Sequence, residues 1–232
     1  MKRKALLIGN TTGLNGVLVD VEKTARFLKS ATGGTWFDSE IEIMYDPGKA
    51  ALLDRVQQLK SLQNDYAFVL FTGHGGHERR TVLQLNGNGE TILDSQLLNI
   101  ASRQLSIYDC CRVLVPRKEI AEALDSITRK FEADTEARRR YEERIMSAIP
   151  QQAQLFACSI GQTSTDTPKG AIYLNHLLAA AGDIKPEAQF KTAEMAHHEA
   201  RIKTTRDQHD QVPTANLPKC LISQQLIIGI RA

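Results

Sequence analysis

Short apolar runs that end in glycine or polar residues recur along this chain, and they limit the folds open to it more than any other feature. Residues 4–8 form the first run and lead into Gly9 and Asn10. Runs of similar form follow at 40–45, 65–72, 104–109 and 153–159. Such runs, bounded by turn residues, are typical of strands buried on both faces of a parallel sheet.

Segments with helical periodicity separate most of these predicted strands. Residues 17–28 place apolar side chains at helical spacing, and further helices are expected at 50–62, 94–101, 171–181 and 193–202. An alternation of strands and helices predicts an open, mostly parallel sheet with helices on both faces. The NGNG sequence at 86–89 predicts an additional β-hairpin over 81–93, and residues 221–230 form the last predicted strand.

The composition sets the class of protein. The 232 residues, 42% hydrophobic and 24% charged, suit one large α/β domain or two small ones. The formal net charge of +2 argues against a nucleic-acid partner. No apolar stretch approaches the about 20 residues that span a membrane, and the first run is shorter than the roughly 7–15 residues of a signal peptide. Four cysteines without a Cys-x-x-Cys spacing predict neither a disulfide scaffold nor a zinc site. We therefore expect a cytoplasmic protein without a membrane partner.

Chemically active side chains follow the predicted strands at the points where these end. His74 lies between glycines after the third run, and Cys111 ends the fourth. Because the carboxyl ends of parallel strands gather at one edge of a sheet, the two side chains are expected to lie close together. A thiolate is a nucleophile, an imidazole transfers protons near neutral pH, and glycine leaves backbone N–H groups open to a substrate. The pattern predicts a cysteine–histidine dyad with an oxyanion hole.

Two adjacent cysteines, Cys110 and Cys111, could supply the thiol. Side chains two residues apart in a strand share a face, so Asp109 and Cys111 are expected to point together, with Cys110 on the opposite, buried side. We therefore predict Cys111 as the nucleophile. Ser159, which ends the fifth run beside a core cysteine, could contact the substrate backbone.

The chain also resembles a known family along nearly its whole length. The segments that carry the resemblance are, in order, ALLIGN (5–10), LNGVLVDV (14–21), FTGHGG (71–76), YDCC (108–111), ACSIGQTSTD (157–166) and QVPT (211–214). Together they are similar to the motifs of metacaspases, which are caspase-like cysteine peptidases. The resemblance implies a caspase-like three-layer sandwich, with a mostly parallel central sheet of about six strands, helices on both faces and a small β-hairpin.

The resemblance also implies roles for individual residues. His74 and Cys111 would form the catalytic dyad, and the backbone N–H groups of Gly75 and Cys111 would line the oxyanion hole. Asp20 and Asp109 occupy the positions of two acids that line the pocket for a basic side chain in metacaspases. Since a guanidinium can bridge two carboxylates, we expect cleavage of protein substrates after Arg or Lys. The expected setting is regulated proteolysis in cell death, stress or defence.

One peptidase domain over 1–232 is expected, in three portions. These are a large-subunit-like portion (1–111), a charged linker (112–150) and a small-subunit-like portion (151–232). In the family this linking region can be cut. Basic residues within it, Lys130 and Arg140 among them, are therefore candidate self-cleavage sites for an enzyme that cuts after Arg or Lys.

Three functions stay open at the level of sequence. Metacaspases usually continue the nucleophile motif with His-Ser-Gly, whereas this chain has Arg112 followed by two apolar residues. A catalytically silent homologue that acts as a scaffold is therefore the alternative to an active peptidase. A doubly wound domain that binds a small ligand is the third reading, although the glycine-rich phosphate-binding motifs are missing.

The sequence says less about cofactors and about the oligomeric state. The sequence supports no cofactor and no metal site, and calcium activation stays open because no clear cluster of acids marks a calcium site. Either a monomer or a homodimer is expected, since the strand 221–230 could be an exposed edge that pairs two protomers.

Other polar residues have structural explanations. His77 and Glu78 are expected on the surface of a loop, and His197 and His198 on the solvent face of a helix. Asp166 is interpreted either as a helix N-cap or as part of the substrate wall, with the cap favoured.

Overall fold

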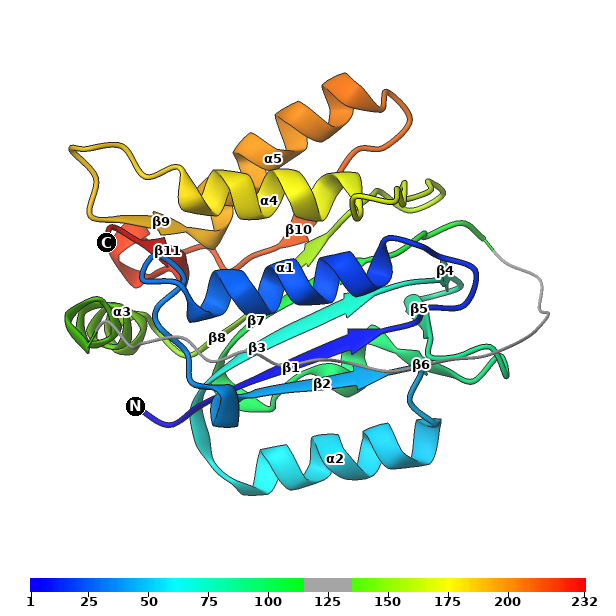
Figure 1. The fold of residues 1–232 in the computed structure, drawn as a ribbon, viewed down its shortest axis with the longest axis horizontal. Coiled ribbons are helices and arrows are strands. Elements are labelled where there is room, and N and C mark those ends of the chain that lie inside the picture. The colour runs from blue at the N-terminus through cyan, green and yellow to red at the C-terminus, as the bar shows by residue number, and fades with distance from the viewer. Residues whose placement is uncertain (115–134) are drawn as a thin grey trace.

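A computed structural model describes residues 1–114 and 135–232, and it contains a six-stranded sheet between two layers (Figure 1). The strand order is β10-β8-β7-β3-β1-β2, and every neighbouring pair is parallel except β10 and β8. This confirms the mostly parallel sheet of about six strands that the sequence predicts. The strands span Arg3–Gly9 (β1), Ile41–Tyr45 (β2), Asn64–Thr72 (β3), Ala101–Asp109 (β7), Gln151–Phe156 (β8) and Thr214–Asn216 (β10).

Helices cover both faces of the sheet, as expected (Figure 1). One face carries α1 (Val17–Lys29), α4 (Ile172–Gly182) and α5 (Ala193–Asp207), and the other carries α2 (Lys49–Ser61). On the α2 side a small antiparallel sheet is formed by β4 (Gly75–His77), β5 (Thr81–Gln84) and β6 (Thr91–Leu93). It contains the predicted hairpin as β5 and β6, and it adds β4, which follows His74 directly.

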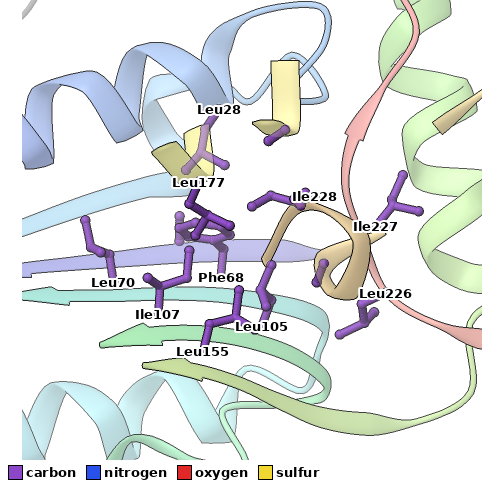
Figure 2. Close-up of a cluster of buried hydrophobic side chains, with 14 of the residues drawn as sticks. Leu28, Phe68, Leu70, Leu105, Ile107, Leu155, Leu177, Leu226, Ile227 and Ile228 are labelled. Atoms are coloured by element: carbon purple, nitrogen blue, oxygen red, sulfur yellow. The ribbon is translucent and has the colours of Figure 1, made fainter. Parts of the chain in front are cut away.

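Residues 5–8 of the first strand are all apolar because both faces of the strand are buried there. Leu7 belongs to the larger core, under α1 and α4, whereas Leu6 belongs to the core under α2. Figure 2 shows the larger core, in which Phe68 and Leu105 from adjacent strands lie below Leu177 of α4. Burying a side chain of this size contributes about 1.5–3 kcal/mol, so the two cores fix the layering.

The predicted last strand differs from the expectation. Residues 222–224 form a 3-10 turn, and β11 (Ile227–Ile230) pairs antiparallel with β9 (Phe190–Thr192) in a separate two-stranded sheet. All four residues of β11 are buried. The part of this segment that is a strand, β11, is therefore not an exposed edge, because its side chains complete the larger core, whereas Leu221 and Ile222 before it are exposed.

The end of the predicted charged linker is a packed element of the domain. Residues Thr135–Ser147 form α3, which buries Ala137, Tyr141 and Ile145, the last two in the larger core. Exposed charged residues lie on another face, where Arg139 pairs with Glu136 and Glu143. The apolar residues recur at helical spacing among many charged ones, which explains why the sequence suggests only a charged linker.

The two candidate self-cleavage sites differ in what the structure says of them. Lys130 lies outside the described residues. Arg140 lies within α3 and is half-buried, with its Nε 3.6 Å from a carboxylate oxygen of Glu136. Cleavage after Arg140 would therefore require α3 to unwind.

Among the described residues, no helix is both long and apolar enough to cross a membrane.

Replacing Tyr141 tests whether α3 belongs to the core. The ring of Tyr141 is fully buried, packs directly on Gly34, and lies 5.7 Å from the Arg3 guanidinium. Tyr141→Ala is expected to lower the free energy of unfolding by about 3–5 kcal/mol, because truncating a buried aromatic leaves a cavity. The exposed Arg139→Ala should leave it nearly unchanged, because surface substitutions have small effects. Urea denaturation of both variants checks this, and equal small effects would contradict a packed α3.

Candidate active site

The pairing of β3 with β7 brings His74 and Cys111 to the same edge of the sheet. Thr72 and Asp109 are the last paired residues of these parallel strands. The Gly73 N–H then donates to the Asp109 carbonyl at 3.1 Å. His74 and Cys111 each lie two residues beyond the last pair. The structure thus assembles the two residues predicted as a dyad.

Both side chains line one pocket of about 390 Å³ at the carboxyl ends of the strands. Its walls come from the loop before α1, the ends of β3 and β7, and the loop before α4. Two carboxylates, those of Asp109 and Asp166, line it, and its lining contains no lysine or arginine among the described residues. The pocket is therefore acidic in character.

A single contact sets the proton arrangement of His74. Its Nε2 lies 2.7 Å from the carbonyl oxygen of Thr12. A carbonyl can only accept a hydrogen bond, so Nε2 must carry the proton. In the neutral ring the lone pair then lies on Nδ1, which is the nitrogen left to take a proton from a nucleophile.

The Cys111 thiol is partly exposed and held by a neighbouring loop. Its Sγ accepts a hydrogen bond from the Ser164 N–H at 3.4 Å and lies 3.6 Å from the Ser164 carbonyl. Burial raises the pKa of Cys111, and the nearby Asp109 carboxylate raises it further. The neutral thiol is therefore the dominant form at pH 7. Cys110 is 2% exposed and packs in the core under α2, on the side opposite Cys111.

Gly75 packs against the cysteine pair. A Cβ atom at this position would lie 2.7 Å from Cys110 Sγ and 2.9 Å from the Cys111 carbonyl oxygen. Such contacts exclude any side chain, so only glycine permits this approach. The close packing places the backbone of Gly75 beside the backbone of Cys111, the two groups predicted to form an oxyanion hole.

The two predicted substrate acids are buried and hydrogen-bonded. Asp109 accepts hydrogen bonds from the Ser164 hydroxyl and the Leu174 N–H, and Asp20 accepts them from the Thr72 hydroxyl and the Ala171 N–H. Asp109 lines the pocket, whereas Asp20 lies behind Thr72 and Ala171, which do. The two carboxylates together hold the first turn of α4, whose own cap residue Ala171 has no side-chain acceptor.

Burial dominates the ionisation of both acids. Burial, with the neighbouring Asp20 carboxylate as the next contribution, raises the pKa of Asp109 to about 7. Burial is also the main cause that raises the pKa of Asp20 to about 6, and the Asp166 carboxylate contributes in the same direction. Nearby carboxylates disfavour one another's charged form, and a bound cation would relieve this repulsion.

The structure places Asp166 in the pocket lining and Ser159 outside it. Asp166 Oδ2 accepts the Gly16 N–H at 3.1 Å, so this side chain binds the loop before α1 and is not the N-cap of α4. It lines the pocket, as the alternative interpretation states. The Ser159 hydroxyl donates to the Val212 carbonyl at 2.8 Å, and Ser159 is not among the residues that line the pocket.

Arg112 has a role that sequence reasoning misses. Its side chain donates to the Thr81 hydroxyl, the Cys158 carbonyl and the Thr214 hydroxyl, and its guanidinium stacks 4.2 Å above the Phe156 ring. Arg112, the residue after Cys111, therefore links the small sheet to β8 and β10. The only signal in the sequence is its position after the predicted nucleophile.

Two of the histidines differ from the expectation. His197 is buried, and its Nδ1 lies 2.7 Å from the Tyr173 hydroxyl, so it faces α4 and not solvent. Burial lowers the pKa of His197 to about 4, which keeps the ring neutral. His77 is half-buried within β4 and does not lie on a loop.

Within 1–114 and 135–232, no group of three or more His, Cys, Asp or Glu side chains is placed to hold a metal ion.

Comparison with known proteins identifies the fold. No protein-family model matches the chain, and no curated protein matches its sequence. Caspase-1 from Spodoptera frugiperda superposes with a TM-score of 0.61 at 13% sequence identity, over 92% of this chain and 85% of that chain. A protein from Geobacter sulfurreducens superposes with a TM-score of 0.59 at 15% identity, over 99% of both chains. The chain has a caspase-like fold.

The raised pKa values of the two acids predict a stability that falls as pH rises. An unfolded aspartate titrates near pH 4, so between about pH 4 and pH 7 the native state binds protons that the unfolded state has released. The free energy of unfolding must then decrease across this range. Asp109→Asn removes the ionisation and should weaken this decrease. Urea denaturation at several pH values measures it, and an unchanged slope would mean that Asp109 titrates normally.

Proposed function

We propose that this protein is a cysteine endopeptidase in which Cys111 is the nucleophile and His74 the general base. The observation that supports this most directly is that the Cys111 thiol lines the same pocket as His74, whose Nε2 lies against the Thr12 carbonyl. The fold that this chain shares with caspase-1 from Spodoptera frugiperda adds support. Cysteine and histidine in such a constellation are the groups that acyl transfer requires.

The proposed reaction follows from the protonation states. As Sγ of Cys111 attacks the carbonyl carbon of the scissile peptide, His74 Nδ1 takes the thiol proton. The backbone N–H groups of Gly75 and Cys111 would donate to the developing oxyanion. The imidazolium then gives its proton to the leaving amine, and the thioester forms. Water, deprotonated by His74, hydrolyses the thioester and restores the thiol.

The preference for Arg or Lys is proposed from the charge of the pocket. Asp109 and Asp166 line it, and Asp20 lies behind one wall. A guanidinium or ammonium ion would offset the repulsion among these carboxylates, whereas an acidic side chain would add to it. An apolar side chain would leave the acids desolvated without a partner, which disfavours it. Regulated cleavage of protein substrates is the setting we infer, and self-cleavage in the segment before α3 stays a prediction.

Cleavage of a fluorogenic Arg peptide by the protein tests the proposed activity. Cys111→Ala is expected to lower kcat/KM by about 10³-fold or more, because it removes the nucleophile. Cys110→Ala serves as the matched control, since it removes a neighbouring thiol that faces the core. Absence of cleavage by the wild type, or equal losses in the two variants, would favour the alternative of a silent scaffold.

Asp20→Asn and Asp109→Asn test the proposed specificity. Each is expected to lower kcat/KM for an Arg peptide by about a hundredfold, because the cation loses part of its charge complement. The matched control is an otherwise identical peptide with alanine before the scissile bond, whose slow cleavage should change little. If both peptides lose activity equally, the acids act only by holding α4, and the proposed preference for Arg or Lys is wrong.

A further inference from the structure

The carbonyl that orients His74 belongs to a loop that needs an external anchor. Thr12 lies in the connection between β1 and α1, next to Gly13, whose φ of +66° lies in the left-handed region. Loops of this kind do not hold one peptide plane unless other groups fix them. The position of the Thr12 oxygen therefore depends on the contacts made by its neighbours.

Asp46 supplies such an anchor from the end of β2. Its Oδ1 accepts the Thr11 N–H at 2.8 Å, and its Oδ2 accepts the Thr11 hydroxyl at 2.5 Å. Both oxygens of one carboxylate thus hold the residue directly before Thr12. Hydrogen bonds to an ionised carboxylate are stronger than bonds between neutral groups. A second contact comes from Asn10, whose Oδ1 accepts the Thr12 N–H at 3.0 Å.

The backbone of Asp46 is itself unusual. Its φ is +46°, and its N–H donates to the Gly9 carbonyl at 2.8 Å. Few residues other than glycine adopt this conformation, and aspartate and asparagine tolerate it best. Strain of this kind persists where surrounding contacts demand it, and it is concentrated at functional sites. Here the strained turn aims the carboxylate across the end of β1 at Thr11.

We propose that Asp46 is a positioning residue for His74, acting through Thr11 and the Thr12 carbonyl. The inference rests on the proposed function, since it concerns the same histidine. Asp46 is not among the described residues that line the pocket, so the role assigned to it is indirect. Through the Thr12 carbonyl it keeps the proton on His74 Nε2, and therefore keeps the Nδ1 lone pair available to the Cys111 thiol.

Three variants test the contact chain in different ways. Asp46→Asn tolerates the left-handed backbone and keeps one acceptor oxygen, whereas Asp46→Ala removes both. Thr11→Val removes the hydroxyl donor while keeping the shape of the side chain and leaves Asp46 in place. The matched control is Asp65→Asn, because Asp65 accepts the Lys2 N–H at 2.7 Å at the opposite end of the sheet.

Two measurements are made on each variant. For the Arg peptide, Asp46→Ala and Thr11→Val are expected to lower kcat on the order of tenfold to a hundredfold, because small displacements of a catalytic group cost that much. KM should stay within roughly twofold, since no substrate contact is lost. Two-bond ¹H–¹⁵N spectra should show the Nε2–H tautomer of neutral His74 in the wild type and a mixture of tautomers in these variants. Asp46→Asn should lie between, and Asp65→Asn should match the wild type.

The spectra separate this inference from the proposed function. If the wild type cuts no peptide, the peptidase proposal fails, yet the tautomer still shows whether Asp46 and Thr11 fix the ring. The inference is overturned if His74 keeps a pure Nε2–H tautomer in Asp46→Ala and Thr11→Val. It is also overturned if Asp65→Asn produces the same losses, because the effect would then reflect general destabilisation.

Discussion

The parallel pairing of β3 with β7 is the constraint on which the candidate site depends. Their last paired residues, Thr72 and Asp109, set the positions at which the two chains leave the sheet. A shift of this register by one residue would turn one of the two side chains to the other face of the sheet. The register is fixed by the cores, because Phe68 and Leu105 must stay in the layer beneath α4 (Figure 2). Packing far from the pocket therefore decides whether an imidazole and a thiol share it.

The acids of the site combine a structural and an electrostatic role. Asp20 and Asp109 bind the amide groups of the first turn of α4, where a helix leaves its N–H groups unpaired and favours negative charge. Burial at the same time disfavours their charged forms. When no ligand is bound, the cost of burying these charged carboxylates lowers the stability of the protein at neutral pH. A cationic ligand would reduce the penalty, which links the stability of the empty protein to the chemistry of its proposed substrate.

The sequence predicts a large part of the fold and the centre of the candidate site. The expected strands at 4–8, 65–72 and 104–109 lie within β1, β3 and β7, because continuous apolar runs reflect burial on both faces. The same reasoning fails where a signal is not local. The stripe that buries Tyr141 is masked by surrounding charges, and the pairing of β11 with β9 depends on a partner distant in the chain. His197 is buried for a similar reason, since only the packing of α5 on α4 decides which face of a helix is covered.

The sequence by itself determined the order of the five parallel strands of the sheet and the residues that end them, since hydrophobic periodicity and turn residues act over a few neighbouring positions. It therefore also determined that His74 and Cys111 follow the carboxyl ends of two strands, whereas the pairing of these strands belongs to the tertiary structure. Tertiary structure alone decided which atoms these residues face. Three sets of hydrogen bonds illustrate this: from His74 to the Thr12 carbonyl, from Thr11 to Asp46, and from Arg112 to Thr81 and Thr214. They join residues that are about 30 to 100 positions apart in the sequence. Such contacts have no local sequence pattern, because they exist only once the sheet has brought its strand ends together.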